Sequence, residues 1–142
     1  MYDALKNKNL FNYDETIASD IFTDREFPWE VLPHIGEFIL TLGKTLSPEE
    51  YDQKEENVWI AKSATVAPTA SINGPCIIGK NAEIRQCAFI RGNAIVGENC
   101  VVGNSTELKN VILFNNVQVP HYNYVGAVSY THLRAHETRS NL

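Results

Sequence analysis

The feature that most constrains the fold of this chain is a six-residue period that runs from residue 60 to residue 120. Ten of eleven positions spaced six apart are aliphatic or aromatic, and they are Ile60, Val66, Ile72, Ile78, Ile84, Ile90, Val96, Val102, Leu108 and Phe114, followed by Pro120. A second series with the same spacing holds small residues, namely Ala64, Ala70, Cys76, Ala82, Ala88, Ala94, Cys100 and Thr106. Neither the 3.6-residue period of a helix nor the two-residue period of a strand produces two such series.

Repeats of six residues are typical of parallel β-helices, and this pattern resembles the left-handed form, in which three repeats make a triangular coil of about 18 residues. The large residues are predicted to fill the interior and the small ones to lie near corners. Residues 58–126 then make just under four coils, which stack at the strand spacing of ~4.8 Å. The predicted fold is mainly β, a single-stranded left-handed parallel β-helix with an N-terminal α-helical segment. Residues 18 apart should be stacked neighbours.

Residues 1–57 lack the six-residue period and are expected to form an N-terminal helical cap over the first coil, because a solenoid needs its end covered. Apolar residues at three- and four-residue steps predict one helix that ends near Gly43, and they are Trp29, Leu32, Ile35, Phe38, Ile39 and Leu42. Ser47, followed by Pro48 and two glutamates, predicts the start of a second short helix.

The period fails after Gly126, since the next two inward positions would be His132 and Thr138. The stretch that begins at Val128 resembles translated adapter sequence joined to a broken reading frame. Residues 127–142 are therefore expected to be a non-native tail, with further coils of the native protein missing. The alternative is a genuine, poorly patterned C-terminal cap.

Charge and composition narrow the functional classes. The net charge is −5, but residues 1–57 carry 13 acidic and 5 basic side chains, whereas residues 58–126 carry 3 acidic and 5 basic ones. An acidic front argues against nucleic-acid binding, and the mildly basic middle suits a small anionic ligand. No apolar run approaches the ~20 residues of a membrane span, and no signal-peptide core is present. We therefore expect a cytoplasmic protein whose three cysteines are free thiols.

Two cations, Arg91 and Lys109, each follow a predicted inward residue and are 18 positions apart. They should therefore be stacked on adjacent coils, where like charges repel unless an anion lies between them. Arginine suits a phosphate because it donates two parallel hydrogen bonds. The alternative is a solvated pair in which Glu107, on the same side of its strand, neutralises Lys109.

His121 is the candidate catalytic base. It follows the predicted inward position Pro120, and counting by 18 places it in one column with Arg85 and Gly103. Imidazole near neutral pH can accept a proton from an attacking amine. The alternative is a half-exposed surface histidine. No metal site is predicted, since the remaining histidine pair, His132 and His136, lies in the tail with no third ligand in reach.

The stretch from Phe89 to Gly126 resembles the acetyltransferase domain of the bifunctional bacterial enzyme that makes UDP-N-acetylglucosamine. The matching pieces, without insertion between them, are Arg91, Gly103-Asn104, Glu107-Leu108-Lys109 and His121-Tyr122-Asn123-Tyr124-Val125-Gly126. Residues 1–126 as a whole are similar to a smaller hexapeptide-repeat group, often labelled UDP-N-acetylglucosamine pyrophosphorylase-like, which has a helical front and no nucleotidyltransferase domain.

This resemblance implies a role for each matching residue. Arg91 and Lys109 would bind the sugar phosphate, Tyr124 would contact the sugar, and His121 would deprotonate the amine that attacks the thioester of the cosubstrate acetyl-CoA. It also implies a homotrimer, when full length, with sites between subunits. Ala127 stands where the family has an aspartate, and the coils that bind acetyl-CoA are expected to be missing, so this chain is expected to be inactive.

The expected function of the full-length parent is therefore acetyl-CoA-dependent N-acetylation of an amino-sugar 1-phosphate in nucleotide-sugar synthesis. The first alternative is a non-catalytic subunit that binds a sugar nucleotide and serves a nucleotidyltransferase of the UDP-N-acetylglucosamine diphosphorylase type. The second is a structural trimeric scaffold with no ligand.

Overall fold

The computed structural model describes residues 32–130. Within them the chain forms a short 3-10 turn, η5 (Leu32–His34), one helix, α2 (Ile35–Gly43), and a series of short strands. The strands are β1 (Tyr51–Glu55), β2 (Val58–Ala61), β3 (Thr65–Val66), β4 (Ser71–Ile72), β5 (Cys76–Ile78), β6 (Glu83–Ile84), β7 (Phe89–Ile90), β8 (Ala94–Val96), β9 (Val101–Val102), β10 (Glu107–Leu113), β11 (Gln118–Val119) and β12 (Tyr124–Tyr130).

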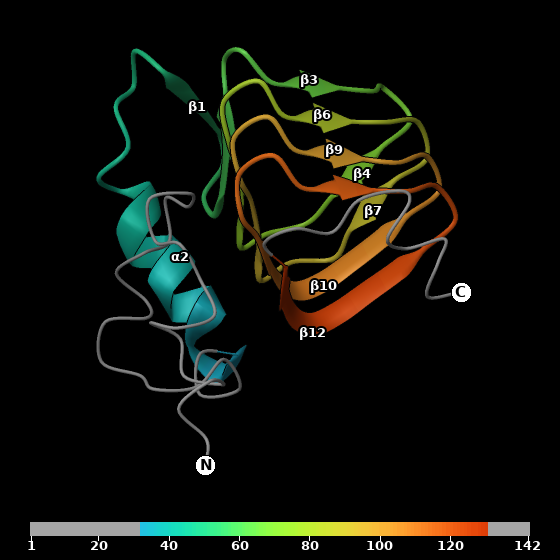
Figure 1. Cartoon of the computed structure of the whole chain (residues 1–142). Helices are drawn as coiled ribbons and strands as arrows, with labels where there is room; N and C mark the ends of the chain where they lie inside the picture. The colour runs from blue at the N-terminus through green and yellow to red at the C-terminus, as the bar shows by residue number, and fades with distance from the viewer. Residues whose placement is uncertain (1–31, 131–142) are drawn as a thin grey trace.

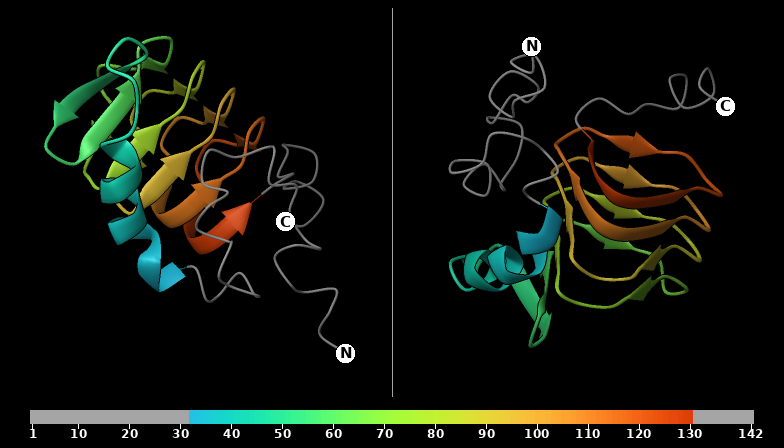
Figure 2. Two further views of the ribbon diagram at one scale, coloured as in Figure 1. Left: turned by 90° about the vertical axis from the view of Figure 1, so that its left-hand side faces the viewer. Right: turned by 90° about the horizontal axis from the view of Figure 1, so that it is seen from below.

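The strands wind into a tube with three walls (Figures 1 and 2). One wall contains β2, β5, β8 and the second halves of β10 and β12, and another contains β4, β7 and the first halves of β10 and β12. The third wall is the four-stranded sheet β3-β6-β9-β11. All of these neighbours pair in parallel, and β1 adds to the first wall as an antiparallel partner of β2. The predicted stacked-coil β architecture is thus present.

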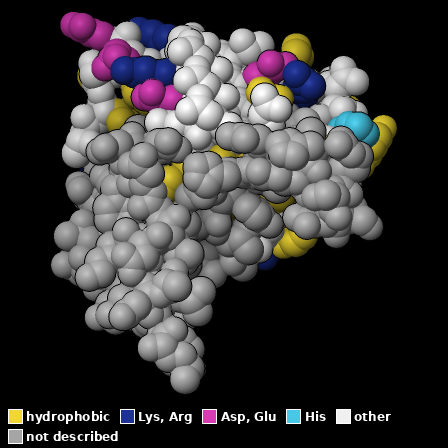
Figure 3. Space-filling view, viewed as in Figure 1, with side chains coloured by type: hydrophobic (Ala, Val, Ile, Leu, Met, Phe, Trp, Pro, Cys, Tyr) yellow, Lys and Arg dark blue, Asp and Glu magenta, His cyan; other side chains and the backbone are white. Residues whose placement is uncertain are grey.

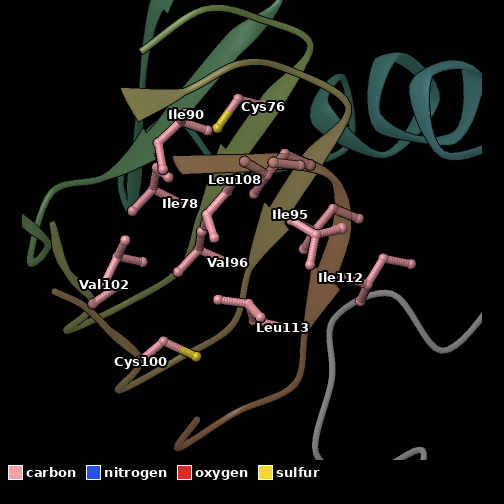
Figure 4. Packing of buried hydrophobic residues seen from close by; sticks show 14 of the residues in the cluster. Cys76, Ile78, Ile90, Ile95, Val96, Cys100, Val102, Leu108, Ile112 and Leu113 are labelled. Carbon is pink, nitrogen blue, oxygen red and sulfur yellow. The ribbon is translucent and has the colours of Figure 1, made fainter. Parts of the chain in front are cut away.

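The interior of the tube is filled by the residues that the sequence predicted to point inward. The large-residue series is fully or almost fully buried from Ile78 through Phe114, and the small-residue series is buried from Cys76 through Thr106. Earlier members of both series, in the first coil, are only partly buried. Cys76 and Cys100 are completely buried, and Figure 4 shows both among the apolar side chains, so these two members of the small-residue series belong to the core.

The wall formed by β2, β5, β8 and β10 is buried on its outer face as well. Ile77, Ile95 and Ile112 are in register on this wall and completely buried, and helix α2 packs against β5, β8 and β10. Figure 4 shows Ile95 and Ile112 on the helix side, with Val96 inside the tube. The helix therefore covers the side of the tube, where we expected it to cover the first coil.

The N-terminal segment differs from its prediction in one further respect. The helix ends at Gly43 as expected, but Ser47 opens a tight turn, with backbone N–H groups of Glu50 and Tyr51 donating to its carbonyl at 3.0 and 2.9 Å. The chain then enters strand β1, so the predicted second helix does not form. Trp29, which we assigned to the first helix, lies outside the described residues.

The stacking distance in sequence is 18 residues in the early coils and 17 in the last. Ala94 pairs with Cys76, 18 positions earlier, but with Val111, only 17 positions later. The coil is shorter because Asn110 alone, with a φ of 52°, makes the corner that Gly92 and Asn93 make in the coil before.

Because this coil is one residue shorter, the predicted register is wrong for the residues that follow Asn110. Leu113 and Val119, rather than Phe114 and Pro120, stand in register with the inward residues Val96 and Val102. Phe114 is nevertheless completely buried.

The end of the described chain is strand β12, which pairs in parallel with both halves of β10 and continues past Gly126 to Tyr130. The predicted tail, residues 127–142, therefore begins inside a strand, and its part from residue 131 onward lies outside the described residues. In residues 32–130, no helix has the length and apolar character that a membrane crossing requires.

Candidate functional site

The two cations that the sequence singled out lie side by side on the outer surface of the β4-β7-β10-β12 wall. Ile90 pairs with Leu108, and the backbone N–H of Arg91 donates to the Leu108 carbonyl at 2.8 Å, so Arg91 is opposite Lys109 on the next coil. Both residues are exposed. The spacing of 18 was the correct register at this point, because the short corner comes only after Lys109.

The neighbouring carboxylate pairs with the arginine and not with the lysine. Arg91 Nη1 donates to Glu107 Oε2 at 2.7 Å, and this hydrogen bond raises the pKa of the Arg91 guanidinium. Within the described part of the chain Lys109 has no ion pair. The alternative, in which Glu107 neutralises Lys109, is therefore wrong in its choice of partner. Glu107 is in register with the residue two positions before Arg91 and reaches across the coils to the arginine.

Aromatic side chains flank this charged group, which we call the cation site (Phe89, Arg91, Glu107, Lys109 and Tyr124). The guanidinium carbon of Arg91 is 5.8 Å from the centroid of the Phe89 ring, a cation–π distance. Tyr124 is in register with Glu107 and is 62% exposed. The site carries two positive charges and one negative charge on a rigid parallel sheet, which suits an anion attached to an apolar or ring-shaped group.

Tyr124 also explains why a glycine follows two residues later. Gly126 continues the column of Arg91 and Lys109, and a Cβ there would collide with the Tyr124 hydroxyl group. The absence of a side chain at position 126 lets the tyrosine ring lie beside the two cations. Phe89 was not among the site residues predicted from the sequence. Its position two residues before Arg91 on a β-strand was the available signal, because residues two apart lie on the same surface.

His121 lies at the corner that joins the third wall to the β4-β7-β10-β12 wall. Its ring meets the Tyr122 ring edge to face at 5.1 Å. Asn123 Nδ2 donates to the carbonyls of Pro120 and His121 at 3.1 and 3.2 Å, and the Thr106 hydroxyl donates to the Pro120 carbonyl at 2.9 Å. The corner that presents His121 is thus fixed by side-chain hydrogen bonds.

The predicted column of Arg85, Gly103 and His121 is wrong by one position. The backbone N–H of Gly103 donates to the Val119 carbonyl, which aligns Gly103 with Pro120, and the short coil moves His121 beside Asn104. Arg85 and His121 nevertheless line one surface hollow on the third wall. No hydrogen bond, ion pair or ring contact among residues 32–130 joins His121 to Arg91, Lys109 or Tyr124.

Among residues 32–130, no group of three or more His, Cys, Asp or Glu side chains is arranged to hold a metal ion. His132 and His136 lie outside those residues.

Comparison with models of protein families gave no match, and no curated protein matches the chain. The functional argument therefore depends on the residues and their geometry, together with the resemblance described above.

Proposed function

We propose that this chain binds an amino-sugar phosphate and belongs to an acetyl-CoA-dependent N-acetyltransferase. The single observation that supports this proposal most is the juxtaposition of Arg91 and Lys109 on adjacent coils. A phosphate between them would replace repulsion of like charges with two charge-assisted interactions. The Tyr124 ring beside them offers a surface on which a sugar ring can stack.

The chemistry assigned to the chain's residues is one of positioning followed by proton transfer. Arg91 and Lys109 hold the phosphate and Tyr124 holds the sugar, which fixes the amine in place and removes most of the entropic cost of reaction. As the amine nitrogen bonds to the acetyl carbon, His121 accepts the proton that the nitrogen loses. Acetyl-CoA supplies the acetyl group. As its carbon–sulfur bond breaks, the sulfur leaves as a thiolate and takes the proton held by His121 to give the free thiol.

The proposal extends to the finer features of the fold. The six-residue spacing of the inward residues supports a left-handed hexapeptide-repeat tube, and the resemblance supports a trimer whose subunits complete each site. Among residues 32–130 no hydrogen bond, ion pair or ring contact joins His121 to the cation site, which agrees with a site shared between subunits. Three cysteines without a disulfide suit the reducing cytoplasm.

Binding is tested by titrating the chain with glucosamine 1-phosphate and, as a control without the phosphate, with glucosamine. We expect saturable binding of the phosphate ester, weakened about tenfold or more by Arg91→Gln or Lys109→Gln, because each removes a charged hydrogen-bond donor. Lys62→Gln is the matched control, since this exposed cation lies on the first coil beside Asp52. Equal affinity for glucosamine, or equal losses from all three variants, would refute the site.

A second candidate function, binding without catalysis, is favoured because no hydrogen bond, ion pair or ring contact joins His121 to the cation site among the described residues. The two candidates differ in the effect of His121→Gln. In a full-length enzyme this variant abolishes acetyl transfer and preserves ligand binding, whereas a full-length binding protein has no transfer to lose. The N-acetylated product should be detected by mass spectrometry rather than by a thiol reagent, because Cys87 is exposed and free.

A further inference from the structure

The third wall carries a hollow in which His121 is the one lining residue that has a role in the proposed function. It has a volume of about 250 Å³ and its polar lining residues are Arg85, Asn104, Gln118 and His121. Val101, Val119 and Pro120 supply apolar surface between them. Figure 3 shows acidic and basic side chains near each other at two places on the visible face, with a histidine on the right of the same face.

The polar side chains of this hollow have hydrogen-bonding capacity that the protein leaves unused. Arg85 donates through Nε to Glu83 Oε2 at 2.8 Å, and its two terminal nitrogens have no partner within residues 32–130. The amides of Asn104 and Gln118 likewise make no side-chain hydrogen bond to any described residue. Four side chains from three successive coils therefore face one hollow, and three of them, Arg85, Asn104 and Gln118, have donors or acceptors that no residue in 32–130 satisfies.

The position of the Glu83 carboxylate indicates whether an anionic or a cationic ligand suits the hollow that contains His121. Glu83 lines a neighbouring hollow of about 390 Å³, which shares Arg85 and Asn104, but it does not line the hollow that contains His121. A ligand on the His121 side therefore meets the guanidinium without meeting the carboxylate. Because Glu83 anchors Nε, the terminal nitrogens form a fork that matches an oxyanion.

We propose that this hollow binds a small oxyanion carried on a hydroxylated carbon skeleton, such as a sugar acid or a sugar phosphate. Arg85 pairs with the oxyanion, and the Asn104 and Gln118 amides, each both donor and acceptor, bind hydroxyl groups. Val101 and Pro120 contact the carbon skeleton. The volume is below the range of about 300–1,000 Å³ that drug-sized ligands occupy, which limits the ligand to roughly one sugar ring.

The test is a residue-resolved NMR titration of the full chain with glucuronate, glucose 6-phosphate and glucose. We expect at least one of the two anionic sugars to shift the amide signals of Gly103 and Asn104 saturably, and glucose to shift them far less. The tighter anion identifies the oxyanion as carboxylate or phosphate. Observation of these two amides separates the hollow from the cation site, where a phosphate would shift Arg91 and Lys109.

Two variants make the assignment specific. Arg85→Gln should weaken anion binding in the hollow by about 10- to 100-fold, and Gln118→Ala by about two- to tenfold, according to the usual worth of charged and neutral hydrogen bonds. Lys62→Gln is the charge-matched control and should change nothing in the hollow. Binding of glucosamine 1-phosphate at the cation site should survive Arg85→Gln.

Three outcomes would overturn the proposal. They are the absence of a shift with either anionic sugar, an equal shift with glucose, and unchanged affinity in Arg85→Gln. None of them bears on the cation site, whose own titration can succeed or fail independently.

Discussion

Removal of one side chain from the helix-covered wall should test how α2 stabilises the tube. Ile95 is completely buried on the outer face of that wall. Ile95→Ala removes three buried carbon atoms, each worth about 0.8 kcal/mol of transfer free energy, or about 2.4 kcal/mol together. The cavity left under the helix adds to this loss, so we expect the free energy of unfolding to fall by about 3–4 kcal/mol.

The assay is urea denaturation followed by circular dichroism, with Val101→Ala as the matched control. Val101 is also β-branched and also lies at an outward position of its strand. It belongs to the third wall, which no described helix covers, and it is only partly buried. We expect its replacement to cost less than about 1 kcal/mol. Equal losses for the two variants, or a loss below about 1 kcal/mol for Ile95→Ala, would show that the helix does not bury this wall.

Three further predictions follow from individual contacts. Gly43→Ala should destabilise the chain although alanine favours helix, because the added Cβ would meet the Trp59 ring, and equal or higher urea resistance would contradict this. Glu107→Gln should tighten phosphate binding about two- to fivefold, since it frees Arg91 from an exposed ion pair worth about 0.2–1 kcal/mol; calorimetry that shows weaker binding would instead make Glu107 a positioning residue. Burial raises the pKa of the Cys100 thiol from 9.0 to about 11, so folding favours the protonated form. The resulting stability is complete below pH 9 and is lost as the pH rises through 11. Cys100→Ala should flatten that decline in urea titrations, and an unchanged decline would refute it.

The sequence predicted the coil architecture because side chains inside a narrow tube must match the geometry at every turn. The alternation of large and small residues therefore remained visible for eight repeats. The 17-residue coil was missed, although one signal was present. The small-residue series ends at Thr106, and its next position holds Ile112, a side chain too large for a corner slot. That mismatch marks the shortened corner at Asn110.

The apolar pattern of the helix alone does not show where the helix packs, because two surfaces of the tube can accept an apolar helix face. An apolar helix face can cover the open end of a tube or the side of one wall. The deciding residues are Ile77, Ile95 and Ile112, which are apolar at outward positions where the other walls carry mixed side chains. A β-strand that is apolar on both faces indicates a buried wall.

The candidate site was predictable only as far as the register was regular. Arg91 and Lys109 were placed correctly because they precede the short corner, and His121 was displaced by one position because it follows the corner. Glu107 pairs with Arg91 rather than with Lys109 because its side chain extends across to the neighbouring coil. The spacing of residues in the sequence does not determine how far a side chain extends.

The most direct test of the central claim is a calorimetric double-mutant cycle with glucosamine 1-phosphate, using Arg91→Gln, Lys109→Gln and the double variant. If one phosphate bridges the two side chains, the losses in binding free energy should be coupled by about 0.5–3 kcal/mol. Losses that add within about 0.3–0.5 kcal/mol, or the same affinity for all four proteins, would contradict the shared anion site.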